Sequence, residues 1–258
     1  LLTSLISQAT LGGALTVLPA GPTHVFDVAG TVEVLLASGT LSSTTELGVL
    51  NGANAALLGN EIIQFQTATL IGANRYRLSM LLRGRAGTEH KVGTHALAER
   101  FVLLSSSVAR IALQNNLIGL ARWYKGVSVG DTLAVTPEQV FIYTGKTLKP
   151  FSPVMIAGTR NLPAANDWTI TWVRRTRVGG EWRDGVDVPL SEESERYEVE
   201  IMQGVTVKRT FTGITSPSIV YTAAQQVTDF GAVQTTLSVK IYQMSAVVGR
   251  GNAGIATL

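Results

Sequence analysis

The sequence predicts an all-β protein built from tandem β-domains, a barrel or sandwich followed by a second sandwich. Short stretches rich in β-branched and aromatic residues alternate with clusters of Gly, Asn, Pro and Ser. Their spacing of roughly 8 to 12 residues is typical of sandwiches and barrels. Apolar residues make up 45% of the 258 residues and charged residues 15%, far from the balance of a disordered chain. A chain of this length is expected to form roughly two or three compact units.

The composition argues against several classes of function. The formal charge of +3 is spread evenly, with 9 basic and 8 acidic residues up to Gly145 and 12 basic and 10 acidic residues after it. Nucleic-acid binding needs a concentrated basic footprint, so we expect no nucleic-acid recognition. The chain has no cysteine, which excludes disulfides, thiol catalysis and cysteine-type zinc sites. No apolar stretch is long enough to span a bilayer.

The first segment, residues 1–24, is expected to be the end of an upstream domain or a linker. The chain begins with Leu1, and its first twenty residues contain no Lys or Arg. A secretory signal peptide needs a basic n-region, so this segment is interpreted as part of a longer protein.

Residues 25–106 are expected to form the first β-barrel or β-sandwich. The segment Leu57 to Phe65 reads LLGNEIIQF, with Gly-Asn at its turn. Ala73-Asn74 then precedes the segment Arg75 to Leu82, which has the composition of a strand. These segments are predicted to be successive antiparallel strands.

Residues 107–147 are predicted to be a β-rich connecting segment. Ser107 to Trp123 contains enough Leu and Ala for a helix of two or three turns. The break at Gln114-Asn115-Asn116 and the β-branched residues favour two strands, with the helix as the alternative.

The last segment, residues 148–258, is predicted to be an immunoglobulin-like sandwich. Pro150 and Pro153 mark a linker, and about seven strand candidates follow in about 105 residues, the size of such a domain. Trp172 shares its parity with Trp168 and should face the core. Tyr242 is expected to pack between the sheets or anchor a corner. The candidates are Val154–Thr159, Trp168–Arg175, Tyr197–Met202, Val205–Phe211, Ser218–Ala223, Leu237–Met244 and Ala253–Thr257.

The C-terminal part resembles fibronectin type III modules. The run VKIYQMSAVVGRGNAG, Val239 to Gly254, is similar to the last two strands of that fold, a tyrosine-bearing strand followed by a Gly-containing turn and an edge strand. Trp172 in TITWVRRT looks like the tryptophan of its second strand. Such sandwiches serve many unrelated roles, so this resemblance implies a fold and no function.

A second resemblance covers most of residues 25–258. Four strings in order resemble the C-terminal part of the large tail-tip hub proteins of siphophages and alphaproteobacterial gene transfer agents. They are LNGANAALLGNEIIQF (Leu50 to Phe65), RLSMLLRGRAGTEH (Arg77 to His90), ERFVLL (Glu99 to Leu104) and WVRRTRVGGEWRDGVDVPLSEESERYEVEI (Trp172 to Ile201). In that family a TIM-barrel-like hydrolase domain lies upstream, so any hydrolytic activity would belong to another part of the protein.

The tail-hub resemblance implies a structural component of the virion tail tip that supports tail assembly and host attachment. It implies a homotrimer around the tail axis, with other tail-tip proteins, namely distal tail, hub-associated and fibre proteins, and the host cell surface as partners. The alternative from the residues alone is a carbohydrate-binding or adhesin module of a larger secreted protein.

The histidines in TEHKVGTH form the one cluster in the sequence that looks like a metal site. His90 and His95, with Glu89, lack further ligands at a recognised zinc spacing. The favoured interpretation is a polar turn in which a histidine hydrogen-bonds the backbone, and we expect no metal and no cofactor.

The glycine-rich run RGRAGTEHK does not match the phosphate-binding pattern GxxxxGK followed by Ser or Thr. Its glycines are explained by tight-turn geometry. Arg83 and Arg85 are expected to brace this turn through carbonyl or carboxylate contacts.

The acidic run SEESERYEVE is interpreted as structural. Adjacent carboxylates on an exposed loop do not face each other across a cleft as glycosidase acids do. Salt bridges are expected between its glutamates and the arginines that precede it: Glu192, Glu193, Glu195, Arg174, Arg175 and Arg177.

Aromatic side chains of the last domain are the candidates for partner contact. Trp168, Trp172 and Trp182 with Tyr197 could form a platform for sugar rings. Trp182 and Arg183, in a loop opened by two glycines, are the predicted partner or receptor contact, since interfaces are enriched in Trp and Arg. None of the three histidines lies in a nucleophile context such as GxSxG, so no enzymatic activity is expected.

Overall fold

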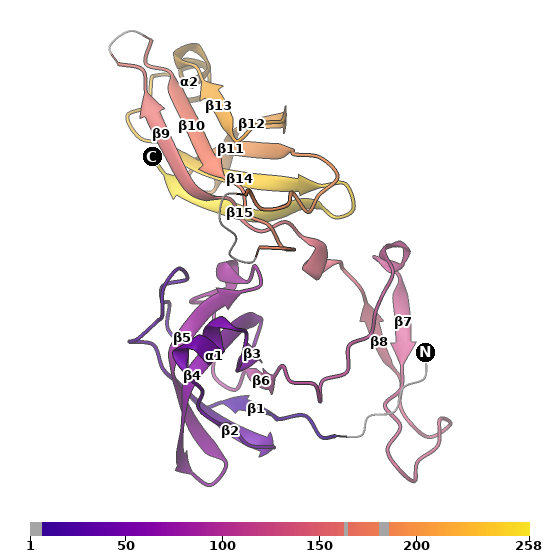
Figure 1. The fold of residues 1–258 in the computed structure, drawn as a ribbon. Coiled ribbons are helices and arrows are strands. Elements are labelled where there is room, and N and C mark those ends of the chain that lie inside the picture. The colour runs from indigo at the N-terminus through magenta and orange to yellow at the C-terminus, as the bar shows by residue number, and fades with distance from the viewer. Residues whose placement is uncertain (1–6, 163–164, 181–185) are drawn as a thin grey trace. The chain divides into compact units, whose positions relative to one another are not determined.

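The computed structural model describes residues 7–162, 165–180 and 186–258. The fold is all-β, with 41% of residues in strands and 9% in helices. It divides into two compact units, Leu1–Arg110 and Ile111–Leu258 (Figure 1). No helix in the described part of the chain has the length and apolarity to cross a membrane. The four segment boundaries expected from the sequence stay predictions.

The first unit is a closed six-stranded barrel with the strand order β1-β2-β5-β4-β3-β6. All its neighbouring strands are antiparallel. Its elements are β1 (Leu11–Ala14), β2 (Val32–Ser38), α1 (Glu46–Leu50), β3 (Ala55–Leu58), β4 (Glu61–Gly72), β5 (Arg75–Arg85), the 3-10 turn η1 (Glu89–Lys91) and β6 (Arg100–Leu103).

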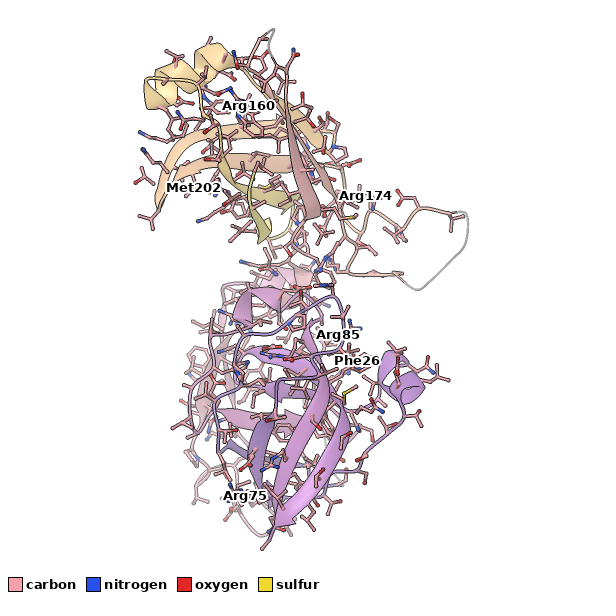
Figure 2. All side chains as sticks on the ribbon, turned by 90° about the vertical axis from the view of Figure 1, so that its left-hand side faces the viewer. Phe26, Arg75, Arg85, Arg160, Arg174 and Met202 are labelled. Atoms are coloured by element: carbon pink, nitrogen blue, oxygen red, sulfur yellow. The ribbon has the colours of Figure 1, made fainter. Side chains whose placement is uncertain are left out.

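Two short turns predicted from the sequence shape this barrel. Gly59 and Asn60 connect β3 to β4, and Gly59 has a φ of +56°, where a side chain would be strained. Ala73 and Asn74 connect β4 to β5, the longest hairpin of the barrel. Figure 2 labels Arg75 and Arg85 at the two ends of β5.

At one further position, two backbones approach so closely that only glycine fits. A Cβ on Gly12 of β1 would meet the carbonyl oxygen of Leu35 on β2. The pairing of these strands shifts in register between Leu11 and Gly12, a bulge that helps to close the barrel.

The barrel interior is a packed apolar core. Alternating residues of β2, β4 and β5 point inward because successive strand side chains face opposite sides. Burying one such side chain contributes about 1.5–3 kcal/mol. The fully buried members include Val32, Val34, Leu58, Ile63, Phe65, Leu78, Leu81 and Phe101.

The second unit contains a seven-stranded sandwich and a separate hairpin. One sheet has the order β13-β10-β9 and the other β12-β11-β14-β15, which confirms the predicted immunoglobulin-like architecture. The sandwich elements are β9 (Val154–Arg160), β10 (Trp168–Val173), β11 (Tyr197–Gln203), β12 (Thr206–Ile214), β13 (Ser218–Tyr221), α2 (Ala223–Phe230), β14 (Ser238–Ser245) and β15 (Gly249–Thr257).

The connecting segment differs from the prediction. It contains η2 (Asn115–Leu117), η3 (Lys146–Leu148) and the two-stranded sheet of β7 (Ala121–Tyr124) and β8 (Gln139–Ile142). Neither the alternative helix nor two strands form over residues 107–123, because η2 lies at the Gln-Asn-Asn break and only β7 follows it.

Trp172 lies in the sandwich core, as its parity predicts. Its side chain is 3% exposed and meets the ring of Tyr197 edge-on, with the ring centroids 5.1 Å apart. Trp168 and Ile170 of the same strand are also buried.

Tyr242 does not pack between the sheets, so that expectation is wrong, and the alternative that it anchors a corner stays a prediction. In β14 it shares the half-buried outer face with Lys240, while Val239 and Ile241 face the core. Its hydroxyl donates to Glu200 Oε2 at 3.1 Å, and the guanidinium of Arg250 lies 4.7 Å from its ring centroid. Strand parity therefore decided its position, and two charged neighbours stabilise it there.

Candidate functional site

The predicted contact residues Trp182 and Arg183 lie outside the described residues, so their role stays a prediction. The structure instead draws attention to a buried charge cluster at one end of the barrel and to a pocket at one end of the sandwich.

Arg83 is the centre of the charge cluster. Its side chain is fully buried on β5 and forms a two-pronged pair with Glu61 of β4, Nε to Oε1 at 2.8 Å and Nη2 to Oε2 at 2.9 Å. Nη1 donates to Asp27 Oδ2 at 3.0 Å and to the carbonyl oxygen of Pro19 at 2.9 Å. Arg85 Nε donates to the amide oxygen of Gln64 at 2.9 Å. The carboxylate and carbonyl contacts predicted for Arg83 form, but they join β5 to other segments and do not brace the turn. The partner of Arg85 is a side-chain amide of β4.

His95 extends this cluster toward the turn before β6. Its Nε2 lies 2.7 Å from Glu61 Oε2 and its Nδ1 lies 2.6 Å from Glu99 Oε2. For His95 the predicted backbone hydrogen bond is replaced by two carboxylate contacts, because the chain folds back and brings this residue next to the start of β4. Both ring nitrogens of His95 therefore contact carboxylate oxygens. For His90 the backbone hydrogen bond stays a prediction. In residues 7–162, 165–180 and 186–258, no group of three or more His, Asp or Glu is arranged to hold a metal ion.

The cluster ties four separate segments together. Asp27 lies between β1 and β2 and forms an isolated β-bridge with Leu81 of β5. Glu61 begins β4, Arg83 is near the end of β5, and His95 precedes β6. Asp27 also accepts from the backbone N–H of Gly30 at 2.7 Å, and Glu61 accepts from that of Gly84 at 2.7 Å. Buried charges of this kind persist only when each is paired and hydrogen-bonded, so the arrangement is a structural clamp.

The protonation states follow from these contacts. Burial alone would raise the pKa of Glu61, but hydrogen bonds from His95, Arg83 and the Gly84 amide outweigh it and hold the pKa at about 2. The carboxylate of Glu61, and to a smaller extent that of Glu99, raises the pKa of His95 above its usual 6.5 against the opposing effect of burial. The cluster is therefore most favourable with Glu61 ionised and His95 protonated.

We expect the stability of the barrel to fall on both sides of weakly acidic pH. Glu61, with a pKa of 4.5 when unfolded and about 2 when folded, contributes ~3 kcal/mol above pH 4.5, which is lost toward pH 2. His95, whose folded pKa is raised, contributes stability below pH 6.5 that is lost as the pH rises through the folded value. Urea unfolding followed by circular dichroism at pH 3, 6 and 9 measures both limbs.

The matched control for this pH dependence is His95→Gln, which keeps hydrogen-bonding groups without a titrating ring. It is expected to flatten the change in unfolding free energy between pH 6 and 9. The loss toward pH 2 should become smaller without disappearing, because Arg83 and the Gly84 amide still lower the pKa of Glu61. An alkaline limb that survives in this variant would contradict the assignment to His95.

The acidic run is bonded internally, in part as predicted. Glu192 pairs with Arg177, Oε1 to Nε at 3.0 Å. Glu195 instead accepts from the hydroxyl of Tyr197 at 2.7 Å, and Glu193 accepts from the backbone N–H of Ala246 at 3.2 Å. These carboxylates fix the chain between β10 and β11 and do not face each other as a catalytic pair would.

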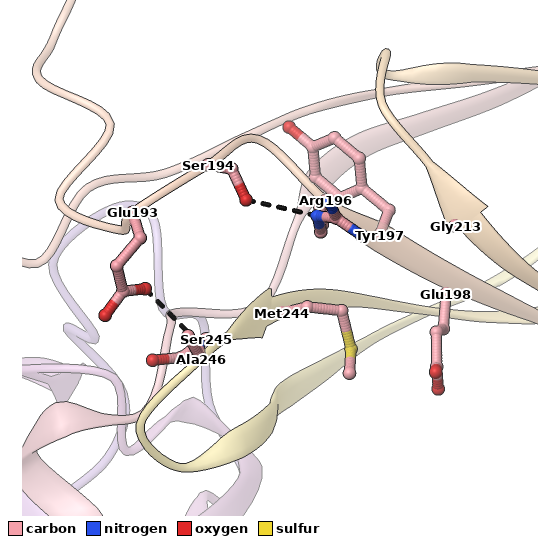
Figure 3. A pocket seen from close by; sticks show the side chains of 9 residues that line it. All are labelled: Glu193, Ser194, Arg196, Tyr197, Glu198, Gly213, Met244, Ser245 and Ala246. Carbon is pink, nitrogen blue, oxygen red and sulfur yellow. Dashed lines mark hydrogen bonds between the residues drawn. The ribbon is translucent and has the colours of Figure 1, made fainter.

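A pocket of about 450 Å³ lies beside this run at the end of β11 and β14 (Figure 3). Ser194 Oγ accepts from Arg196 Nε at 3.2 Å within it. No histidine is among the residues that line it, and the lining combines polar and charged side chains with apolar ones such as Met244 and Ala246. It is lined by Glu193, Ser194, Arg196, Tyr197, Glu198, Gly213, Met244, Ser245 and Ala246.

The structure does not form the aromatic platform considered for sugar rings from the residues that it describes. Trp168, Trp172 and Tyr197 are all buried in the sandwich core, at most 4% exposed. Their rings stabilise the fold and are not available to a ligand.

The charge cluster could not be found from sequence spacing. Arg83 and Glu61 are 22 positions apart, and Arg83 and Asp27 are 56 positions apart. The available signal was a single arginine inside the apolar run SMLLRG, which demands a buried partner but does not identify it.

Comparison with known proteins gives one family match. Residues 9–102 match the family model described as "Rcc01698-like, C-terminal", which covers the barrel from β1 to β6. The match is compatible with a C-terminal region related to gene transfer agents or phages, and it names no hub. A search of curated proteins found no match.

Comparison with solved structures includes the crystal structure of the rat CD45 extracellular region, domains d3–d4. It is 14% identical over 60% of this chain and 71% of that chain, with a TM-score of 0.31. A similarity at this level carries no argument about fold or function.

Proposed function

We propose that this chain is a structural component of the tail tip of a phage or gene transfer agent, where it supports tail assembly and host-surface attachment. The observation that carries the proposal is the family match over residues 9–102, which coincides with the closed barrel. The tail-hub strings of the sequence lie partly in the same region, at Leu50–Phe65 and Arg77–His90.

The use of polar groups in the barrel supports a structural role. Asp27, Glu61, Arg83 and His95 are directed at one another and are at most 5% exposed. Groups that catalyse a reaction must reach a substrate, whereas these four side chains bind one another and hold four segments of the barrel together. We therefore propose assembly and attachment, and no chemistry, for this chain.

The proposal includes partners and a location. The chain would lie in the virion at the tail tip, as one of three copies around the tail axis, in contact with other tail-tip proteins and with the host cell surface.

Imaging assembled particles tests this proposal. A reconstruction of particles from cells that carry the gene is expected to place the barrel and the sandwich at the distal end of the tail in three copies. Particles that assemble and attach normally without this chain would contradict it. Specific binding of the purified chain to a defined glycan, with no copy in the particle, would favour the adhesin alternative.

A further inference from the structure

The hairpin of β7 and β8 is incomplete as a folding unit. The two strands pair only with each other among the described residues, as Figure 1 shows, and each has four residues. An isolated two-stranded hairpin is marginally stable at best in water, and it needs a further strand or a packed face. The sheet is therefore open to completion by a further strand.

One face of the hairpin is entirely apolar. Residues directly opposite in an antiparallel pair lie on the same face. Trp123, Val140 and Ile142 are exposed by 60%, 58% and 48%, and no charged side chain interrupts them. This face is formed by the pairs Ala121–Ile142 and Trp123–Val140.

The other face is mixed. Tyr124 and Phe141 meet edge-on across it, with the ring centroids 6.3 Å apart. Phe141 nevertheless remains 53% exposed. Arg122 and Gln139 complete this face and make it amphipathic.

The two free edges carry opposite charge. Arg122 lies in β7 and Lys125 directly after it, whereas Glu138 directly precedes β8. Arg122 Nη1 donates to the carbonyl oxygen of Ala121 at 3.0 Å, and Lys125 Nζ donates to that of Leu133 at 2.8 Å. Within the ranges that the structure describes, none of these three charges has an ion-pair partner. The β7 edge is basic and the β8 edge acidic.

We propose that a second copy of this chain completes the sheet by adding its β8 edge, antiparallel, to the free β7 edge. If the added strand keeps the register of the hairpin, Tyr124 opposite Gln139, then Lys125 lies opposite Glu138 of the second copy. The apolar side chains of both copies then form one continuous face. Backbone hydrogen bonds provide the attachment, and the charges select the edge and the direction.

Charge and size argue for this occupant. The hairpin and its loop contain two basic and two acidic residues, Arg122, Lys125, Asp131 and Glu138, so they offer no net attraction to an anionic bilayer. Strands of four residues give an interface at the weak end, below about 1,200 Å². Because unlike edges meet, the contact is heterologous and either closes into a ring or continues as a filament. The association is therefore concentration-dependent.

Sedimentation velocity of the 258-residue chain from about 5 to 200 μM tests the proposal. The wild type is expected to shift reversibly to larger species with concentration. Lys125→Glu and Glu138→Lys each place like charges across the new edge, so each variant alone is expected to stay monomeric. An equimolar mixture restores opposite charges at every contact between the two variants, and it is expected to associate again. Lys208→Glu, an exposed charge reversal on β12, is the control and is expected to behave as the wild type.

Mixing separates this contact from a salt bridge inside one hairpin. A pair within one molecule cannot be rescued by a second molecule, so a mixture that remains monomeric overturns the proposal. A wild type that stays monomeric at 200 μM also overturns the proposal. The same holds if, in a separate flotation experiment, the monomeric chain binds lipid vesicles. This inference goes beyond the tail-tip role and depends on the hairpin alone, so the solution experiment and the particle reconstruction can fail independently.

Discussion

Replacing Arg83 by methionine is expected to lower the free energy of unfolding of the barrel by about 3–5 kcal/mol. The guanidinium is fully buried between Glu61, which is also fully buried, and Asp27, which is 5% exposed at its side chain. Methionine fills part of the volume but leaves both carboxylates without their cation. This loss is a large fraction of a typical total of about 5–15 kcal/mol, so the barrel is expected to unfold at a clearly lower urea concentration.

The measurement must report on the barrel alone. All four tryptophans, Trp123, Trp168, Trp172 and Trp182, lie after residue 110, so intrinsic tryptophan fluorescence follows the second unit. Urea unfolding by circular dichroism, with hydrogen exchange of β4 and β5 peptides, is expected to show the destabilisation. The fluorescence transition should remain unchanged.

Arg77→Met is the matched control for Arg83→Met. Arg77 also pairs with a glutamate, Glu33, but it is 53% exposed, and such pairs contribute about 1 kcal/mol or less. The double variant Arg83→Met with Glu61→Leu is expected to recover part of the lost stability, because it also removes the buried carboxylate that Arg83→Met leaves without a cation. A loss below about 1 kcal/mol for Arg83→Met would refute the clamp.

Trp172→Ala is expected to cost the sandwich about 3–5 kcal/mol. The indole is 3% exposed, packs edge-on against Tyr197, and lies among residues from both sheets. Alanine would leave a cavity at the contact between the sheets, where relaxation of the surrounding strands is limited. The second unit, with its smaller sheet of three strands, would then unfold at lower denaturant concentration.

Fluorescence of the remaining tryptophans measures this effect directly. Val173→Ala is the control, because Val173 is the next residue of β10, points to the opposite face and is 48% exposed. It is expected to change the unfolding free energy by less than about 1 kcal/mol. Equal effects of the two substitutions would mean that Trp172 does not anchor the core.

The strands were largely predictable because their signals are local. The turns at Gly59-Asn60 and Ala73-Asn74 and the seven sandwich strands all form near the expected positions. The helix α2 was not predicted, although Thr222 and Gln225 form a capping box that is visible in the sequence as TAAQ. Its apolar pattern is short, and the strand predicted over Ser218–Ala223 overlaps its first residue.

For the connecting segment, the positions of the strands could not be predicted from the sequence. It contains the strands β7 and β8, but the loop between them is longer than a tight hairpin turn, and the boundaries of the strands depend on the pairing itself. The exposed apolar face of Trp123 and Val140 could not be recognised from the sequence, where the same pattern is equally typical of a buried strand.

The sequence by itself determined the all-β class, the absence of cysteine chemistry and the inward position of Trp172, since composition and two-residue alternation are local properties of a strand. Only the tertiary structure decided which charges meet. Arg83, Glu61, Asp27 and His95 come from four segments, and they are brought together by strand register and barrel closure, which are set by the whole sheet. For Tyr242 the alternation of β14 is visible in the sequence, but only the packed sheets show which of its two faces is the core. Val239 and Ile241 face the core, and the tyrosine contacts Glu200 and Arg250.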